Sequence, residues 1–88
     1  DEHPNHYGAT YELALAHFLN KNYEKTAELL QRAVTMPDAT DQTFAMLGNA
    51  YDMCGDKEKA MATYNEGLKK FPKSGYLYTE LGITSAID

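Results

Sequence analysis

Residues 41–74 decide the fold of this chain and read DQTFAMLGNAYDMCGDKEKAMATYNEGLKKFPKS. In the first half, apolar or small residues recur at the spacing of one helix face, at Phe44, Leu47, Gly48 and Tyr51. In the second half the same spacing recurs at Ala60, Tyr64, Leu68 and Phe71. Gly55-Asp56 separates the halves as a helix stop followed by an N-cap. The stretch therefore predicts two helices joined by a tight turn.

The rest of the chain repeats this stretch with a period of 34 residues, counted from Leu13 to Leu47 and from Leu47 to Leu81. At the same shift, a small residue recurs at Ala14, Gly48 and Gly82. The loop and the second helix also match: Asn22, Glu24, Lys25, Ala33 and Val34 meet Asp56, Glu58, Lys59, Gly67 and Leu68. A repeat of this length indicates stacked helical units that bury a core only together.

The period divides the chain into a leading segment 1–6, a degenerate first copy 7–40, a complete second copy 41–74 and the first helix of a third copy, 75–88. The second copy resembles the tetratricopeptide repeat, with Phe44 where the family often has Trp and Gly67 where it usually has Ala. The first copy departs further from the family pattern, at Thr10, His17, Thr26 and Pro37. The resemblance implies an all-α solenoid of antiparallel helix hairpins, stacked as a right-handed superhelix.

Start and stop signals predict five helices, at residues 8–20, 23–36, 41–54, 57–71 and 75–87. Pro37 and Pro72 are expected to end the helices before them. The recurring small residues suggest how the helices pack, because a small side chain lets two helices cross closely. We therefore expect close crossings at Ala14, Gly48, Ala60 and Gly82, and a stable centre in the 41–74 hairpin.

In the tetratricopeptide repeat family, the first helix of each hairpin lines the concave surface of the superhelix. The resemblance therefore implies a non-catalytic scaffold that binds a partner peptide or helix in this groove. The implied groove residues of the first copy are Tyr11, Leu15, Phe18 and Leu19. Those of the second copy are Gln42, Ala45, Asn49, Asp52 and Met53, and those of the third are Tyr76, Thr79, Ile83 and Ile87.

Two interpretations of the first helix stay open, because residues 13–19 make it apolar nearly all round. Its apolar side chains either form the partner groove or are covered by neighbouring helices, including upstream helices outside this sequence. Asn49 and Asp52 likewise either bond the backbone of a ligand or belong to a solvated face. For the whole chain, the alternatives to a scaffold are a self-assembly element and a helical accessory domain of a longer protein whose catalytic part lies elsewhere.

One groove chemistry of the family is a clamp in which Lys, Asn and Arg bind the terminal carboxylate of a ligand. The matching places here hold no cation: they are Tyr11, Leu15, Met46, Tyr76 and Glu80. Asn49 stands alone and does not replace the set. We therefore expect no binding of acidic chaperone tails in this manner.

Charge and composition narrow the class of partner to proteins and peptides. The 88 residues carry a formal net charge of −5, which argues against nucleic acid or an anionic membrane surface as the main partner. The longest apolar run is too short for a membrane span, so we expect no membrane insertion. A single cysteine, Cys54, excludes an internal disulfide and fits a reducing compartment such as the cytoplasm without establishing one.

No cofactor, metal site or catalytic residue is expected. His3 and His6 have the spacing of metal ligands, but a pair of histidines in a leading segment is more often simply exposed. His17 lies on the packing stripe of the first helix and is expected in the core. Cys54 ends a helix with no histidine nearby, which argues against a nucleophile.

The last expected helix presents Tyr78, Leu81 and Gly82 to a second helix that this sequence does not contain. Terminal repeats normally have a polar outer face, and this one is apolar. We expect the natural protein to continue with a helix that covers this face, and the isolated chain to pair with a second copy. Such a homodimer would be two-fold symmetric, because the patch would meet the same patch.

Overall fold

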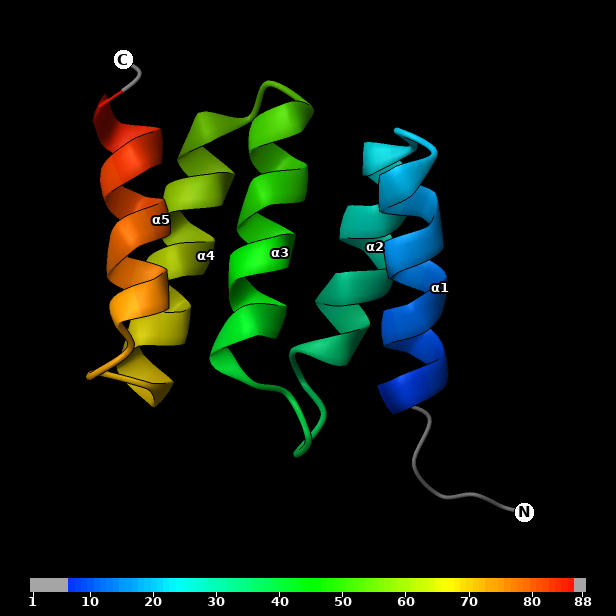
Figure 1. Cartoon of the computed structure of the whole chain (residues 1–88), viewed down its shortest axis with the longest axis horizontal. Helices are drawn as coiled ribbons and strands as arrows, with labels where there is room; N and C mark the ends of the chain where they lie inside the picture. The colour runs from blue at the N-terminus through cyan, green and yellow to red at the C-terminus, as the bar shows by residue number, and fades with distance from the viewer. Residues whose placement is uncertain (1–6, 87–88) are drawn as a thin grey trace.

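The computed structural model describes the backbone of residues 7–86 and the side chains of residues 7–82. Its helices are α1 (Tyr7–Leu19), α2 (Tyr23–Ala33), α3 (Asp41–Met53), α4 (Lys57–Lys70) and α5 (Gly75–Ala86). Successive helices run antiparallel, and residues 7–86 contain no strand (Figure 1). The helices α1, α3 and α5 form one layer, with α2 and α4 behind it. The predicted all-α architecture of helix hairpins is confirmed.

The turn between α3 and α4 is built as its sequence predicts. Gly55 has a φ of +85°, a left-handed conformation that glycine adopts without a steric penalty. Asp56 caps α4, and its Oδ1 accepts a hydrogen bond from the backbone N–H of Lys59 at 3.2 Å. The equivalent turn of the first hairpin has Lys21 in the place of Gly55, with a φ of +65°. Lys21 therefore carries backbone strain that Gly55 avoids.

The helix α2 ends at Ala33, before the predicted residue 36. The N–H groups of Thr35 and Met36 bond to carbonyls three residues back, at 3.2 and 3.1 Å, which is the geometry of a tight turn. The hydroxyl of Thr35 also donates to the carbonyl of Arg32 at 2.7 Å. The helix ends before Pro37 as predicted, but three residues earlier than the predicted residue 36, because these turn bonds end it first.

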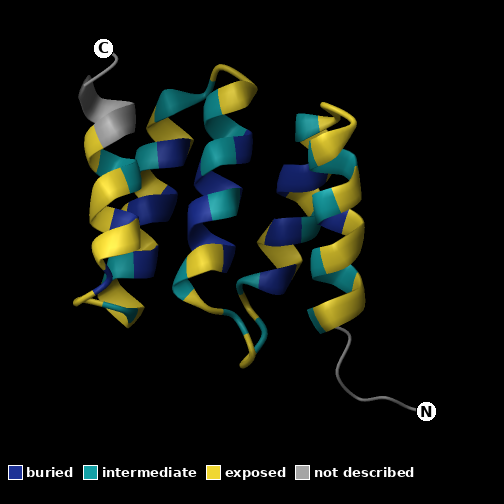
Figure 2. Ribbon diagram, viewed as in Figure 1, coloured by how far each residue is buried: buried dark blue, intermediate teal, exposed yellow. Residues whose placement is uncertain are grey.

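The core consists of two clusters that share α3. The first lies among α1, α2 and α3 and contains Ala14, Ala27, Leu30, Ala33, Leu47 and Ala50. The second lies among α3, α4 and α5 and contains Phe44, Ala45, Ala60, Tyr64 and Leu77. Buried residues accordingly occur on both sides of α3 (Figure 2). Because α3 contributes to both clusters, it is the structural centre of the described chain.

The close approach of α3 and α4 depends on Gly48. A Cβ atom at this position would lie 2.3 Å from Cε1 of Tyr64, whose side chain is fully buried. Gly67 of α4 is also tight, since its Cβ would lie 2.8 Å from both Leu77 Cδ1 and Phe44 Cβ. The predicted close crossing at Gly48 is confirmed, and the same constraint accounts for glycine where the family usually has alanine.

The outer side of α5 is open. Nothing lies within 4 Å of the Cβ position of Gly82, so no described helix crosses α5 closely at this point. The predicted crossing there is with a helix that this sequence does not contain. Tyr78 is 55% exposed, and its hydroxyl donates to the carbonyl of Pro72 at 3.2 Å. Leu81, by contrast, is half-buried against the second core cluster.

Candidate partner-binding surface

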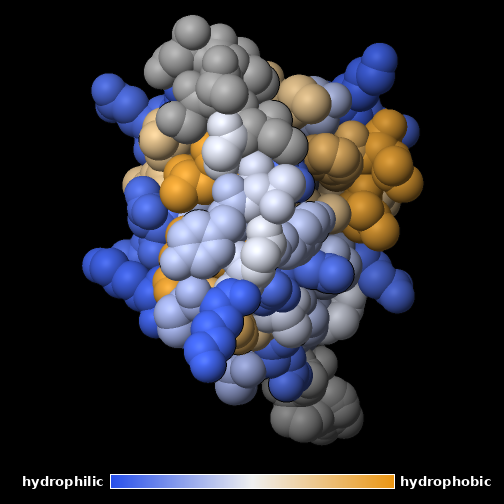
Figure 3. Space-filling view, turned by 60° about the vertical axis from the view of Figure 1, so that its left-hand side comes forward, coloured by the Kyte–Doolittle hydropathy of each residue, from blue (hydrophilic) through white to orange (hydrophobic). Residues whose placement is uncertain are grey.

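The candidate site is the exposed side of the first helices α1, α3 and α5, which lies toward the viewer in Figure 1. We call it the front face and define it by residues in one helical register: Tyr11, Leu15, Leu19, Met46, Asn49, Asp52, Met53, Tyr76 and Thr79. Three of its large apolar members are well exposed, with Leu19 at 73%, Met53 at 58% and Tyr76 at 45%, whereas Tyr11, Leu15 and Met46 are half-buried. In the space-filling view, hydrophobic side chains form a cluster at the upper right (Figure 3). Leu19 and Met53 end α1 and α3, whereas Tyr76 lies at the start of α5, so the exposed apolar side chains are spread along the front face. Their exposure on one face makes it the candidate interaction surface.

Tyrosine side chains on α1 pack together and contact α3 on the front face. Tyr7 and Tyr11 stack on α1 with ring centroids 5.7 Å apart, and the Tyr7 hydroxyl bonds to Thr43 Oγ1 of α3. Partial burial raises the pKa of the Tyr11 hydroxyl above its usual 10.0, and the nearby Tyr7 and Tyr76 hydroxyls raise it further. Tyr76 belongs to α5, which lies on the far side of α3 from α1, so its influence on Tyr11 is a minor electrostatic one.

Several predicted groove residues have other positions or lie outside the described part. Ala45 is fully buried in the second core cluster, so the prediction that it lines the groove is wrong. Its methyl group fills space where α3 packs against α4 and α5. Phe18 is half-buried, and its ring meets the Tyr23 ring edge-on at 5.4 Å, which ties α1 to the start of α2. The side chains of Ile83 and Ile87 lie outside the described residues.

The polar members of the front face are partly engaged within the protein. Asn49 is half-buried, and its Oδ1 accepts a hydrogen bond from the Tyr64 hydroxyl at 3.2 Å. Thr79 donates through Oγ1 to the carbonyl of Gly75 at 2.8 Å. Asp52 is half-buried, and Gln42 is exposed at the start of α3. Asn49 therefore supports the buried Tyr64, in addition to any contact that its free amide nitrogen makes with a ligand.

Sequence reasoning missed two fully buried residues that hold the front layer together. Leu77 packs in the second core cluster, and Thr43 bonds to Tyr7 across α1 and α3. The signal was present, because Thr43 and Leu77 are also 34 residues apart and each precedes the aromatic position of its copy. Threonine and leucine differ in polarity, so the shared inward direction of this position is not evident from residue type.

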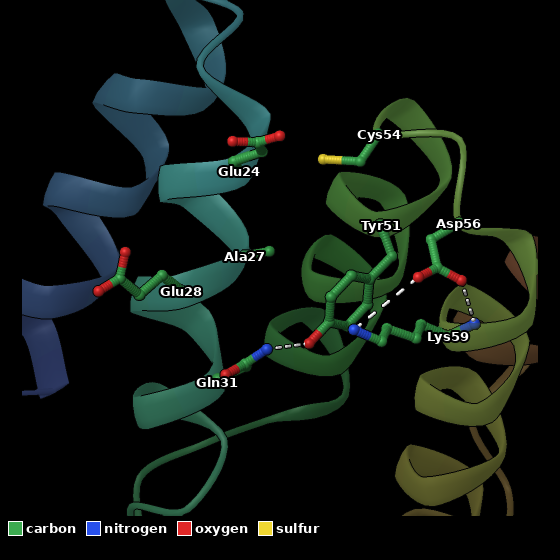
Figure 4. A pocket seen from close by; sticks show the side chains of 8 residues that line it. All are labelled: Glu24, Ala27, Glu28, Gln31, Tyr51, Cys54, Asp56 and Lys59. Atoms are coloured by element: carbon green, nitrogen blue, oxygen red, sulfur yellow. Dashed lines mark hydrogen bonds and ion pairs between the residues drawn. The ribbon is translucent and has the colours of Figure 1, made fainter.

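A recess separate from the front face lies between α2, the C-terminal half of α3 and the start of α4 (Figure 4). Its volume is ≈ 480 Å³, and it is lined by Glu24, Ala27, Glu28, Gln31, Tyr51, Cys54, Asp56 and Lys59. Gln31 Nε2 donates to the Tyr51 hydroxyl. Lys59 Nζ lies 3.8 Å from Asp56 Oδ2 and 5.6 Å from the centre of the Tyr51 ring. The chain's own ammonium group thus occupies one end of the recess.

Cys54 at the mouth of this recess is not activated as a nucleophile. The residue is exposed overall, but partial burial of its sulfur raises the pKa of the thiol above the usual 9.0, and the Glu24 and Asp56 carboxylates raise it further. A raised pKa keeps the thiol protonated at neutral pH, whereas the thiolate is the reactive form. The residues that line the recess include no histidine to accept the proton.

The described residues show no group of three or more His, Cys, Asp or Glu side chains that could hold a metal ion. His17 is half-buried at the α1–α2 turn, where its Nδ1 accepts a hydrogen bond from Asn22 Nδ2 at 3.3 Å. The prediction that His17 is a core residue is therefore wrong, because its ring bonds to the exposed Asn22. His3 and His6 lie outside the described residues. None of the described helices has the length and apolar content needed to cross a membrane.

Comparison with known proteins decides the family. A sequence model of the tetratricopeptide repeat matches residues 41–84, which is half of the chain. The chain belongs to the tetratricopeptide repeat family. The general transcriptional corepressor trfA of Dictyostelium discoideum is 31% identical to it over 77 residues. That match covers 85% of this chain and 6% of the corepressor, so the chain spans only a small part of this relative's length.

Within the matched residues, family membership makes α3 and α4 the first and second helices of one repeat. The family match begins at Asp41, where α3 also begins, and extends into α5. The carboxylate-clamp places hold Tyr11, Leu15, Met46, Tyr76 and Glu80. Because α1, α3 and α5 contain no Lys or Arg, these helices carry no cationic clamp for a ligand carboxylate.

Proposed function

We propose that this tetratricopeptide repeat segment is a non-catalytic scaffold that binds a partner peptide or helix on its front face. The observation that carries the proposal is the exposure of Leu19, Met53 and Tyr76, one large apolar side chain from each first helix. Burial of such side chains against a partner is the main favourable term in protein association. In the family this layer forms the concave groove, which supports the assignment.

The remaining observations agree with protein binding. Tetratricopeptide repeats generally act as interaction scaffolds. The name of the similar Dictyostelium discoideum protein describes that protein as a transcriptional corepressor. For this chain the likeness supports a role in protein interaction.

Self-assembly is the second candidate function, favoured by the open side of α5. Tyr78 is 55% exposed there, and the Cβ position of Gly82 faces open space. A second copy covering this surface would form a two-fold homodimer. Sedimentation velocity over a wide concentration range tests this candidate. A dimer that dissociates in Tyr78→Glu supports it, and a strict monomer at high concentration rejects it.

Selection from a random peptide library, with the wild-type chain as bait, tests the scaffold proposal without knowledge of the natural partner. The selected peptides should bind the wild type and lose most of their affinity for Leu19→Glu, because a carboxylate would be placed in the apolar contact. Leu13→Glu is the matched control, since Leu13 is also an exposed leucine of α1 but points away from the front face. Peptides that bind Leu19→Glu as tightly as the wild type would overturn the proposal.

A further inference from the structure

The charged side chains of this chain are segregated between the two helix layers. The first helices α1, α3 and α5 contain four carboxylates, Glu12, Asp41, Asp52 and Glu80, and neither Lys nor Arg. All eight cationic side chains lie on α2, on α4 or in the connections: Lys21, Lys25, Arg32, Lys57, Lys59, Lys69, Lys70 and Lys73. The front layer is therefore acidic, while the charges of the rear layer are mixed.

Three of the four carboxylates share the register of the apolar front face. Glu12 lies one turn before Leu15, Asp52 is next to Met53, and Glu80 lies one turn after Tyr76. The fourth carboxylate, Asp41, is engaged within the chain, because its Oδ2 accepts a hydrogen bond from Ser74 Oγ at 2.7 Å.

None of these three carboxylates forms an ion pair within the described part of the chain. The ion pairs of Lys25 with Glu28 and of Lys59 with Asp56 belong to the α2–α4 side. Glu12 is exposed, and Asp52 and Glu80 are half-buried. Their negative charges are therefore balanced by no nearby ion pair and act on whatever approaches the front face.

We propose that the front face prefers a partner segment in which basic side chains flank apolar anchors, such as a basic amphipathic helix. The apolar side chains of that segment contact Leu19, Met53 and Tyr76, and its Lys or Arg side chains lie beside Glu12, Asp52 and Glu80. Complementary charges at the rim of an apolar contact favour one class of partner and repel the other. A cation above the exposed ring of Tyr76 gains a further cation–π attraction. This inference rests on the proposed function and assigns the chemistry of the partner.

Three synthetic peptides of about 15–20 residues, long enough to form a helix on binding, test the preference directly. All three have leucines at i, i+3, i+4 and i+7 and differ only in the flanking residue, which is Lys, Gln or Glu. Fluorescence anisotropy should show the Lys peptide binding about 3- to 30-fold more tightly than the Gln peptide, with the Glu peptide weakest. The difference should shrink as salt is raised. Equal Kd values for the Lys and Gln peptides would overturn the inference.

Protein variants separate local recognition from the general attraction of an acidic protein for a basic peptide. Glu12→Gln/Glu80→Gln should weaken binding of the Lys peptide several-fold and leave the Gln peptide unaffected. Glu58→Gln/Glu66→Gln is the matched control, because it removes the same charge from exposed positions of α4. Equal weakening by both double variants would contradict recognition at the front face.

Leu19→Ser separates the failure of this inference from the failure of the proposed function. If the Lys and Gln peptides bind equally and both are lost in Leu19→Ser, the front face binds partners without charge preference, and the inference alone fails. If neither peptide binds the wild type, or both bind Leu19→Ser unchanged, the proposed function fails together with the inference.

Discussion

Gly48 and Gly82 occupy the same place in successive repeats but have opposite surroundings, so the same substitution should have opposite effects. Gly48→Ala places a methyl group 2.3 Å from the Tyr64 ring and forces α3 and α4 apart. Overpacking of this kind costs about 1–3 kcal/mol of unfolding free energy. Gly82→Ala adds the methyl group to open space and stabilises α5 by about 0.5–1 kcal/mol through helix propensity. Urea denaturation measures both, and equal effects would contradict the packing at Gly48.

Lys21 is a second position at which one residue determines local stability. It adopts the left-handed φ of +65° that its repeat partner Gly55 adopts without strain. Lys21→Gly should raise the unfolding free energy by about 0.5–1 kcal/mol, because relief of the strain exceeds the entropy cost of glycine in the unfolded chain. Gly55→Lys should lower it by a similar amount. Thermal melts of the two variants check this, and a loss of stability in Lys21→Gly would show that the turn is built differently.

At the scale of single elements, α5 depends on one buried side chain. Leu77 is fully buried, whereas its neighbour Tyr78 is 55% exposed. Leu77→Ala should therefore cost about 2–5 kcal/mol, the usual range for a buried leucine. Tyr78→Ala should cost much less in the monomer. Circular dichroism during urea unfolding compares the two variants, and equal destabilisation would show that α5 is not docked through Leu77.

The electrostatic influence of Tyr76 on Tyr11 should be visible in the titration of Tyr11. Its pKa is raised in the folded chain, so the stability it contributes is present below about pH 10 and is lost as pH rises through the folded-state pKa. Tyr76→Phe removes one source of the shift and should lower the pKa of Tyr11. NMR of the tyrosine Cζ carbons measures this. Tyr78→Phe is the control. A Tyr11 pKa that does not change in Tyr76→Phe would contradict the influence of Tyr76 on Tyr11.

The elements themselves were largely predictable from sequence, because their start and stop signals are local. Four of the five helices begin and end within one residue of the predicted bounds. The exception is the end of α2, where Thr35 bonds back to the Arg32 carbonyl and competes with helix geometry before Pro37 is reached. Such a competition depends on side-chain conformation, which residue spacing does not specify.

At the scale of the whole molecule, the repeat register predicts which helices form the front layer, but not which of its residues stay accessible. Ala45 is buried because α4 and α5 close over it, and Phe18 turns to Tyr23 of α2. Both outcomes depend on contacts between different helices, which the residue spacing within one helix does not specify. The distribution of Lys, Arg, Asp and Glu can be read from the sequence. It indicates an acidic surface only once the structure shows that α1, α3 and α5 share one layer.

The central claim is that a partner segment binds the front face, and NMR of the labelled chain titrated with the leucine–lysine peptide tests it most directly. The account predicts that the largest changes in chemical shift occur at Leu19, Met53 and Tyr76, with smaller changes at Glu12 and Glu80. It would be contradicted by changes confined to the recess between α2 and α4, at residues such as Glu24, Cys54 and Lys59.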